Sequence, residues 1–291
     1  MTIYQASPPK KTRATQGEME ARAAFLLAYA DRHGPVTVRQ LYYVAEVKGL
    51  PGISKAEGDY DKVQRQVLKL RREKRMPYSA IADATRWMRK PATFDSVADA
   101  LRETAALYRR NIWSDHPEHV EIWVEKDALA GVIYPVTSEY GVPLMVSRGF
   151  SSETFAFEAA QSYAADGRPV HVYHLGDFDR SGVAAAEDLR RKLTSFAAEA
   201  GVRVHFTRLG VTVDQIEAWS LPTRAPKRES AADRRWPYDF ACELDAIEPS
   251  MLRTLVRGAI RKHMPDDHLR AAQIAEQSER EQLRIFAGRA A

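Results

Sequence analysis

Cysteine is nearly absent from this sequence, since Cys242 is the only one among its 291 residues. A single thiol excludes an intramolecular disulfide framework, and no Cys/His spacing typical of a metal site occurs. Long apolar runs are also missing: no stretch approaches the ~18 apolar residues of a membrane span, and residues 1–11 contain no signal-peptide core. We therefore expect a soluble, unsecreted, cytoplasmic protein without a membrane partner.

Glycine motifs that bind nucleotides are missing as well. The sequence contains neither a P-loop nor a dinucleotide-binding G-x-G-x-x-G, so bound ATP or NAD is not expected. Apolar material is plentiful, because 45% of the residues are hydrophobic. A chain of this length and composition can bury a substantial core and can form two domains.

Basic residues are distributed unevenly along the chain. Residues 1–120 hold 21 Lys and Arg against 14 Asp and Glu, a net charge of +7, whereas the remainder carries −3. A basic first third attracts polyanions with an affinity that depends on salt. DNA is the partner that we expect there, and an ordinary helical domain with a solvated charged face is the alternative.

The first third of the chain is predicted to be helical. Residues 1–16 are rich in Pro, Lys, Thr and Gln and predict a basic disordered tail. Three short helices and the segment 76–83, which is short enough for a wing or return strand, favour a winged-helix DNA-binding domain over 17–95. The helices are expected over about 18–32, from Thr37 to the break at Gly49, and over 59–75.

Most of the predicted DNA contacts lie on the third of these helices. Its apolar positions, Tyr60, Val63, Val67 and Leu70, share one side, and its basic residues lie elsewhere. In winged-helix proteins the third helix commonly enters the major groove. The residues predicted to contact DNA are Lys62, Arg65, Lys69, Arg71 and Arg72, together with Arg148 and Arg180 from the second domain.

A parallel α/β domain is predicted over residues 118–291. It follows a linker over 96–117, which is expected to be helical from about Ser96 to Trp113. Apolar strands alternate there with helices of ten or more residues, which is typical of a parallel layered sheet, and a helical extension closes the chain. Residues 221–239 lack periodicity and predict a mobile basic loop. The strands are expected over about 119–125, 142–148, 169–175 and 202–209.

Two acidic strand ends are the most informative feature of that domain. Glu125 closes one strand, and Asp177 and Asp179 follow another strand, with Asp177 52 positions after Glu125. In a right-handed parallel sheet all three carboxylates reach the same carboxyl edge. Clustered carboxylates without a balancing cation predict a hard divalent metal, Mg²⁺, and with it phosphate chemistry.

Other uses of these acids remain open. The carboxylates can be ordinary surface groups, with Glu125 paired to Lys126 or Arg148. Glu243 and Asp245 are candidates for one further metal ligand, although helix capping or ion pairing is the expected use of both residues.

These residues also carry a family resemblance. The sequence Val124-Glu125-Lys126-Asp127-Ala128, followed by Gly176-Asp177-Phe178-Asp179-Arg180-Ser181-Gly182, resembles the toprim domain. The version it resembles most is that of the topoisomerase VI A subunit and of the related meiotic enzyme that makes programmed double-strand breaks. The resemblance covers residues 118–210 best, and it implies Glu125, Asp177 and Asp179 as Mg²⁺ ligands.

The same family places a winged-helix domain before the toprim domain, with a catalytic tyrosine in an Arg-x-x-Tyr-Tyr sequence that Arg39-Gln40-Leu41-Tyr42-Tyr43 matches. In a helix that starts near Thr37, Tyr42 lies on the apolar stripe and Tyr43 about 100° further round. Tyr42 is then the better core residue and Tyr43 the better nucleophile, which matches the second tyrosine that the family uses. A tyrosine pair that only packs is the alternative.

Three arginines are expected to assist the tyrosine. Arg39 lies one helical turn before Tyr43 and can favour the phenolate, and Arg148 or Arg180 can steady the phosphate. Each arginine can equally be part of a structural ion pair.

The resemblance implies Mg²⁺-dependent DNA cleavage by tyrosine transesterification, which leaves a 5′-phosphotyrosyl link and a free 3′-hydroxyl. It also implies a homodimer, in which the tyrosine of one protomer works with the metal site of the other, and a separate ATPase or other partner subunit. Two other functions stay open: a toprim nuclease that hydrolyses DNA with a metal-activated water, and a non-catalytic DNA-binding regulator or assembly subunit.

Overall fold

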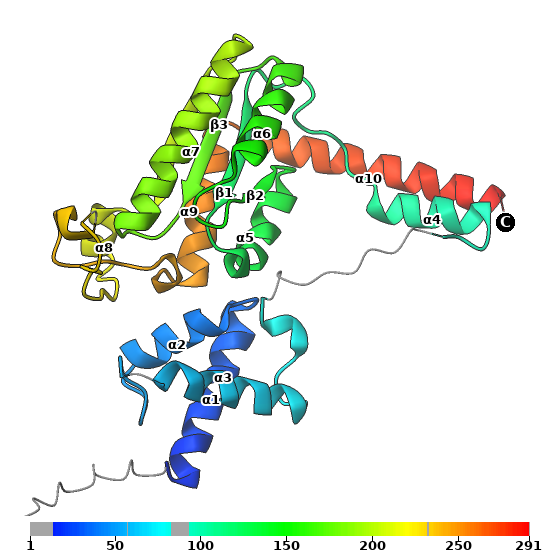
Figure 1. The fold of residues 1–291 in the computed structure, drawn as a ribbon. Coiled ribbons are helices and arrows are strands. Elements are labelled where there is room, and N and C mark those ends of the chain that lie inside the picture. The colour runs from blue at the N-terminus through cyan, green and yellow to red at the C-terminus, as the bar shows by residue number, and fades with distance from the viewer. Residues whose placement is uncertain (1–13, 57, 83–92, 232, 291) are drawn as a thin grey trace, which may run out of the picture.

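The chain divides into a small helical part and a larger part built on a parallel sheet (Figure 1). The structure is a computed structural model, and it describes residues 14–56, 58–82, 93–231 and 233–290. Residues 1–13 of the predicted tail and Asp83 of the predicted wing segment lie outside the described residues. The mixed α/β architecture expected from the sequence is confirmed.

Three helices form the N-terminal part. They are α1 (Gln16–His33), α2 (Val38–Val47) and α3 (Asp59–Arg72). Thr15 and Thr37 start α1 and α2 with capping boxes, in which the hydroxyl oxygen accepts a hydrogen bond from the backbone N–H three residues later. Apolar side chains from all three helices bury one another in a single cluster. The three helices predicted in this part are therefore present.

The segment after α3 contains no strand pair within residues 76–82. Arg72 ends α3 three residues before its predicted end, at a turn in which Lys74 has a φ of 59°. A 3₁₀ helix, η1 (Tyr78–Ala80), follows, and Ile81 forms one parallel bridge with Val36. The expected return strand is reduced to this bridge, which fixes the segment beside the start of α2.

Four parallel strands form the central sheet in the order β2-β1-β3-β4. They are β1 (His119–Val124), β2 (Leu144–Val146), β3 (Val170–Leu175) and β4 (Val204–Gly210), each at its predicted position. β1 and β3 are neighbours, with Val124 opposite Leu175. The residues that follow these two strands therefore share the carboxyl edge of the sheet.

Helices cover both faces of the sheet (Figure 1). α6 (Glu153–Asp166) and α7 (Arg180–Glu199) pack on one face, and α5 (Asp127–Glu139) and α9 (Pro249–Arg261) pack on the other. Successive strand residues point to opposite faces. Trp123 is accordingly buried under α6 and α7, whereas its neighbours in β1 are buried under α5 and α9.

α4 (Val97–Leu107) and α10 (Asp266–Arg289) form a two-helix arm that projects from the sheet (Figure 1). The prediction of a linking helix as far as Trp113 is wrong, because α4 ends at Leu107. The residues that follow α4 form hydrogen bonds with α10 instead. The hydroxyl of Tyr108 donates to Glu279 Oε2 at 2.9 Å. None of the described helices, α10 included, is long and apolar enough to cross a membrane.

Short elements lie between β4 and α9. They are α8 (Val213–Ala218), η2 (Asp233–Arg235) and η3 (Leu244–Ala246). The loop predicted to be mobile over 221–239 is held by polar contacts: the N–H of Arg224 donates to the carbonyl oxygen of Ala241 at 2.9 Å, and the guanidinium of Arg228 donates to backbone carbonyls. Such contacts leave no periodic signal in the sequence.

Candidate active site

Glu125 and Asp177 meet at the carboxyl edge of the sheet. Glu125 follows β1, Asp177 follows β3, and the backbone N–H of Asp177 donates to Glu125 Oε2 at 3.0 Å. Asp179 starts α7, where its Oδ1 accepts from the backbone N–H of Gly182 at 2.8 Å. The structure therefore brings the three predicted metal ligands to one edge, as the sequence predicts.

Two glycines allow the acidic turns to approach each other. A Cβ at Gly176 would lie 2.7 Å from Glu125 Oε2 and 2.8 Å from His174 Cε1. A Cβ at Gly182 would collide with the backbone carbonyl oxygen of Asp177. Any side chain at either position would push the carboxylates out of place.

Two further carboxylates come from a distant segment. An antiparallel bridge between Phe178 and Cys242 brings Glu243 and Asp245 beside the edge. The backbone N–H of Leu244 donates to Asp177 Oδ1 at 2.8 Å, which fixes this segment to the acidic turn. The ion pairing expected for both residues is present.

Lys126 lies at the centre of the cluster. Its Nζ is 2.9 Å from Asp177 Oδ1, 3.1 Å from Glu243 Oε2 and 2.7 Å from Asp245 Oδ2. Burial alone would lower the pKa of Lys126, but these carboxylates raise it, so the ammonium group stays charged. The expectation of carboxylates without a balancing cation is therefore wrong, because the residue after Glu125 supplies one.

Two arginines that the sequence did not single out add to this balance. Arg224 Nη2 lies 2.9 Å from Asp179 Oδ2. Arg208 Nη2 donates to the backbone carbonyl oxygen of Gly176 at 3.0 Å. Arg208 lies in β4 and Arg224 in an aperiodic loop, so no local motif identifies either of them.

Glu125 differs from the other acids of the cluster. Within the described part of the chain no Lys or Arg forms an ion pair with it, and Arg148, one proposed partner, pairs instead with Asp127 at 2.8 Å. Burial raises the pKa of Glu125, and the charge of Asp177 raises it further against the hydrogen bond from the Asp177 backbone. Burial raises the pKa of Asp177 as well.

By chemistry this donor set suits a hard divalent cation, although among the described residues the carboxylates of Glu125, Asp177 and Asp179 are not a group whose ligand atoms all lie within 4.8 Å of one another. Carboxylate oxygens are the ligands that Mg²⁺ prefers, and a cation beside two carboxylates with raised pKa values would offset the free energy of keeping them ionised. Glu125, Asp177 and Asp179 are the residues that would hold it, with Lys126 as their neighbour.

Helix α2 is bonded to the same cluster. Arg39 Nη1 lies 2.8 Å from Glu243 Oε2, and the hydroxyl of Thr37 donates to Asp245 Oδ1 at 3.2 Å. Burial raises the pKa of Tyr43, and the negative charge of Glu243 adds to this effect while the positive charge of Arg39 opposes it. The phenol of Tyr43 therefore lies within the electric field of the cluster, although it is held in the protonated form.

Tyr42 has the packing role predicted for it. Its ring is partly buried against the apolar cluster of α1, α2 and α3 and meets the ring of Tyr60 edge-on, with centroids 5.7 Å apart. Its hydroxyl donates to the carbonyl oxygen of Ser54 at 2.9 Å. Tyr43 does not belong to that apolar cluster.

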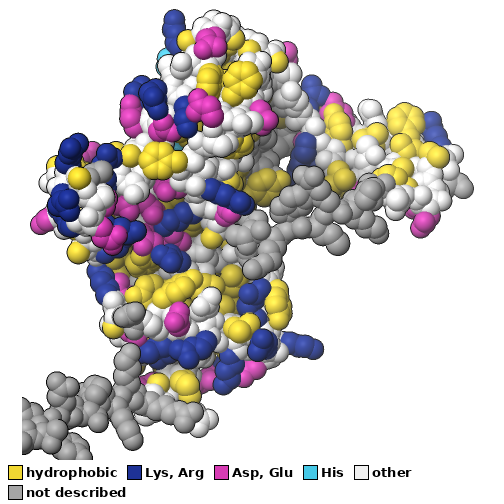
Figure 2. Space-filling model, in the orientation of Figure 1, with side chains coloured by type: hydrophobic (Ala, Val, Ile, Leu, Met, Phe, Trp, Pro, Cys, Tyr) yellow, Lys and Arg dark blue, Asp and Glu magenta, His cyan; other side chains and the backbone are white. Residues whose placement is uncertain are grey.

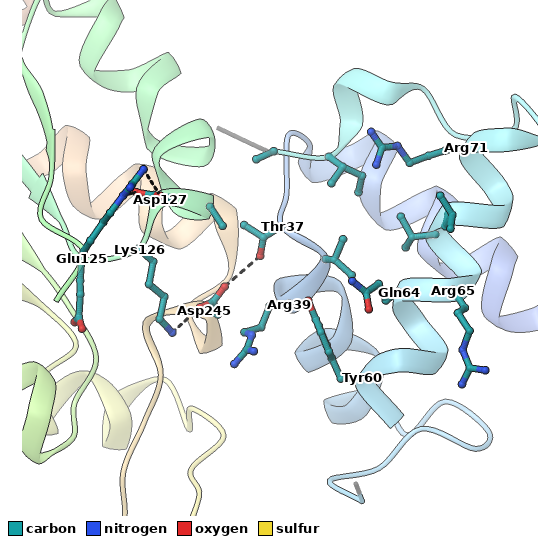
Figure 3. Close-up of a pocket in the computed structure, with 17 residues that line it drawn as sticks. Thr37, Arg39, Tyr60, Gln64, Arg65, Arg71, Glu125, Lys126, Asp127 and Asp245 are labelled. Carbon is teal, nitrogen blue, oxygen red and sulfur yellow. Dashed lines mark hydrogen bonds and ion pairs between the residues drawn. The ribbon is translucent and has the colours of Figure 1, made fainter. Parts of the chain in front are cut away.

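A cavity of about 830 Å³ separates α2 and α3 from the turn between β1 and α5 (Figure 3). Figure 3 shows Lys126 and Asp245 pointing toward each other on one wall, with Arg65 and Arg71 on α3 across the cavity. The basic side chains that line it are Arg39, Arg65, Arg71, Lys126 and Arg148. A polyanion in this cavity would lie beside Glu125, which also lines it.

The predicted DNA contacts fall into separate places. Arg65, Arg71 and Arg148 line the cavity, whereas the other three on α3 lie outside it. Arg180 lies apart, at the start of α7. Figure 2 shows Lys and Arg side chains gathered over the N-terminal helices, in the lower half of the view.

Two of the basic residues on α3 that lie outside the cavity already have acidic partners. Lys62 pairs with Asp59 at 2.7 Å, and Lys69 pairs with Glu73 at 3.7 Å. Arg72 is exposed. These side chains are part of a solvated charged face, and their role in DNA binding stays a prediction.

Comparisons with protein-family models and with curated proteins find no match to this chain. Fold and site together define a mixed α/β protein with a four-stranded parallel sheet, whose carboxyl edge carries a charged cluster facing a three-helix part.

Proposed function

We propose that this chain cleaves DNA by Mg²⁺-dependent tyrosine transesterification, as a winged-helix and toprim protein of the topoisomerase VI A-subunit type. The contact between Arg39 and Glu243 carries the proposal, because it joins the helix that bears Tyr43 to the carboxylates at the sheet edge. The cavity beside this contact supplies basic walls for a phosphate backbone. The motif resemblance described above adds support that is independent of this geometry.

The phenolic oxygen of Tyr43 bonds to a backbone phosphorus, and the bond from that phosphorus to the 3′ oxygen breaks. The phenolic proton passes to solvent, and the departing oxygen takes a proton to become a free 3′-hydroxyl. Glu125, Asp177 and Asp179 would hold a magnesium ion, which would supply positive charge that offsets the charge of the phosphate.

The positive residues around Tyr43 then have a defined task. Arg39 and Lys126 lower the pKa of Tyr43 against burial and against the charge of Glu243. Their charges stabilise the phenolate as it forms. Asp127 holds Arg148 on the cavity wall, where its guanidinium can bind a phosphate oxygen.

The test is a cleavage assay on supercoiled plasmid with Mg²⁺, denatured and run with and without protease. Wild type should give cut DNA that carries protein until it is digested, and Tyr43→Phe and Glu125→Gln should give none. Tyr42→Phe is the matched control, since Tyr42 bonds to the Ser54 carbonyl and should remain active. Loss of adduct in Tyr42→Phe but not in Tyr43→Phe would contradict the assignment.

Dimerisation in the manner of the resembling family can be tested with the same variants. We propose that the tyrosine of one protomer serves the metal site of its partner. Co-expressed Tyr43→Phe and Glu125→Gln chains would then regain cleavage, because one intact combination forms across the dimer. If Tyr43 instead serves the cluster of its own chain, beside which it lies here, the mixture stays inactive.

Metal-dependent hydrolysis is the second candidate, and one observation favours it. Glu125 lines the cavity, whereas Tyr43 does not, and burial raises the pKa of the Tyr43 phenol. In that case Tyr43→Phe still cuts and leaves free ends, while Glu125→Gln does not cut. DNA binding without cleavage by any of these proteins would favour a regulator or assembly subunit, in which the ion pairs of Lys126 serve only to hold the fold together.

A further inference from the structure

We propose a second metal site at the amino edge of the sheet, formed by Glu118, His171 and His263 and suited to a transition-metal dication of the zinc class. Each of these residues offers one ligand atom, and the three atoms lie within 4.8 Å of one another. None of the three belongs to the carboxyl-edge cluster, so the site is independent of the proposed cleavage reaction.

The topology explains why these residues meet. Glu118 precedes β1 and His171 is the second residue of β3, and these strands pair with His119 opposite Val170. His263 follows α9, which packs on the same face of the sheet. Because parallel strands begin at the same edge, Glu118 and His171 must lie at the end opposite to Glu125.

The spacing is already close to that of a metal shell. His171 Nε2 lies 3.2 Å from Glu118 Oε1, and His263 Nδ1 lies 2.6 Å from Glu118 Oε2. Ligand atoms at about 2.1 Å from a tetrahedral zinc ion are about 3.4 Å apart. Both observed separations are shorter than this value, so the side chains would move apart to surround an ion.

Neighbouring side chains hold His263 in the orientation that a ligand needs. The hydroxyl of Tyr173 lies 2.8 Å from His263 Nε2, which leaves Nδ1 to face Glu118. A metal-binding histidine usually has such a partner on its other nitrogen.

His116 holds the two backbone segments together. Its Nε2 lies 2.8 Å from the carbonyl oxygen of His263, and its Nδ1 lies 3.2 Å from the backbone nitrogen of Glu118. In the neutral tautomer the ring donates to the first and accepts from the second. The positions of Glu118 and His263 are thus set by more than the hydrogen bond between them.

The donor set selects the kind of ion. Two imidazoles and one carboxylate suit zinc and similar dications, whereas Mg²⁺ prefers oxygen ligands alone. The side chain of His263 is 8% exposed and that of Glu118 is 36% exposed, so water can complete the shell from the surface. The bound ion would clamp the starts of β1 and β3 to the end of α9, where the arm helix α10 begins.

The test uses full-length protein stripped of metal by a chelator and then held in excess Mg²⁺. Calorimetric titration should show one Zn²⁺ per chain, and Co²⁺ used as a probe should give the absorption bands of a nitrogen- and oxygen-bound ion. Zn²⁺ at 100 times its Kd should raise the free energy of unfolding by about 2.7 kcal/mol. Tyr173→Phe removes the partner of His263 and should weaken Zn²⁺ binding by about tenfold or more.

Matched variants separate this site from other sources of zinc binding. Glu118→Gln and His171→Asn should each lose the Zn²⁺ site, and either one suffices if circular dichroism shows that the other is unfolded. His205→Asn and Glu125→Gln should keep it: the ring of His205 only stacks on that of His171, with centroids 4.6 Å apart, and Glu125 lies at the other edge. Unchanged stoichiometry in Glu118→Gln and His171→Asn, or no Zn²⁺ binding by wild type, would show that Glu118 is only a hydrogen-bond acceptor for the two histidines.

Discussion

Arg39 Nη1 lies 2.8 Å from Glu243 Oε2, and this ion pair connects the helix that carries Tyr43 to the acidic edge of the sheet. The two residues are 204 positions apart in the chain. A second contact, from Thr37 to Asp245, lies two residues away along each of the two segments. The placement of α2 over the site therefore depends on residues 243–245, which follow Cys242 and its bridge to Phe178.

The pair of Arg39 and Glu243 should show measurable coupling. Arg39 is 45% exposed, so we expect a double-mutant cycle of Arg39→Ala and Glu243→Ala in urea to give a coupling free energy of only about 0.5–1 kcal/mol. The effect on cleavage should be larger, because Arg39 also acts on the pKa of Tyr43. Strictly additive unfolding free energies would show that the contact contributes nothing to placing α2.

Lys126 should be far more important for stability than Arg148, although both carry one ion-paired charge. Lys126→Met leaves Asp245, whose side chain is 2% exposed, without its cation, and we expect a loss of about 3–5 kcal/mol. Arg148→Ala breaks a pair whose arginine is 71% exposed and should cost about 0–1 kcal/mol. Urea unfolding of both variants at neutral pH measures this difference. Equal losses would mean that the cluster is solvated rather than buried.

Glu125→Gln should stabilise the metal-free protein at neutral pH. The pKa of Glu125 lies above its usual 4.5, so the folded state binds this proton more tightly than the unfolded state. The free energy of unfolding then falls as pH rises from about 4.5 through the folded-state pKa. The advantage of the variant should therefore be present at pH 7 and vanish below pH 4.5.

With Mg²⁺ bound, wild type should become more stable than Glu125→Gln. Mg²⁺ should raise the melting temperature of wild type, by an amount equivalent to about 2.7 kcal/mol at 100 times its Kd, and leave Glu125→Gln unchanged. Differential scanning calorimetry across pH with and without Mg²⁺ measures both effects. A wild type that is the more stable protein at pH 7 without metal would show that Glu125 has a structural partner.

DNA affinity should depend on salt through the cavity arginines. Arg65→Gln and Arg71→Gln should each reduce the slope of log affinity against log salt by about one, if each guanidinium contacts one phosphate. Arg284→Gln is the control, since Arg284 lies on the arm and pairs with Glu281. Fluorescence anisotropy over a salt series gives the slopes, and an effect confined to Arg284→Gln would place the DNA on the arm instead.

Much of the fold follows from local sequence. Thr15 and Thr37 start helices because their hydroxyls satisfy free backbone N–H groups, and the strands follow from short apolar runs between helices. The meeting of Glu125 with Asp177 was predictable too, because right-handed connections place the ends of neighbouring parallel strands together.

Electrostatic balance was decided only by the tertiary structure. Lys126 is adjacent to Glu125 in sequence, but its partners Glu243 and Asp245 arrive through the bridge between Phe178 and Cys242. No periodicity marks such a contact, since it depends on how loops far apart in the chain pack. The sequence therefore identified the acids of the site and offered Lys126 as a cation beside Glu125, but it did not show which acids Lys126 would pair with, nor single out Arg208 and Arg224.

The amino-edge cluster shows the same division. No local motif connects His171, which lies in β3, with Glu118 or His263. Glu118 and His263 reach His171 because the sheet aligns the starts of β1 and β3 and α9 ends beside them. Sequence by itself determined the elements and the acidic strand ends, because these depend on neighbouring residues. Tertiary structure alone decided which charges and ligands meet, because those pairs are fixed by packing between elements.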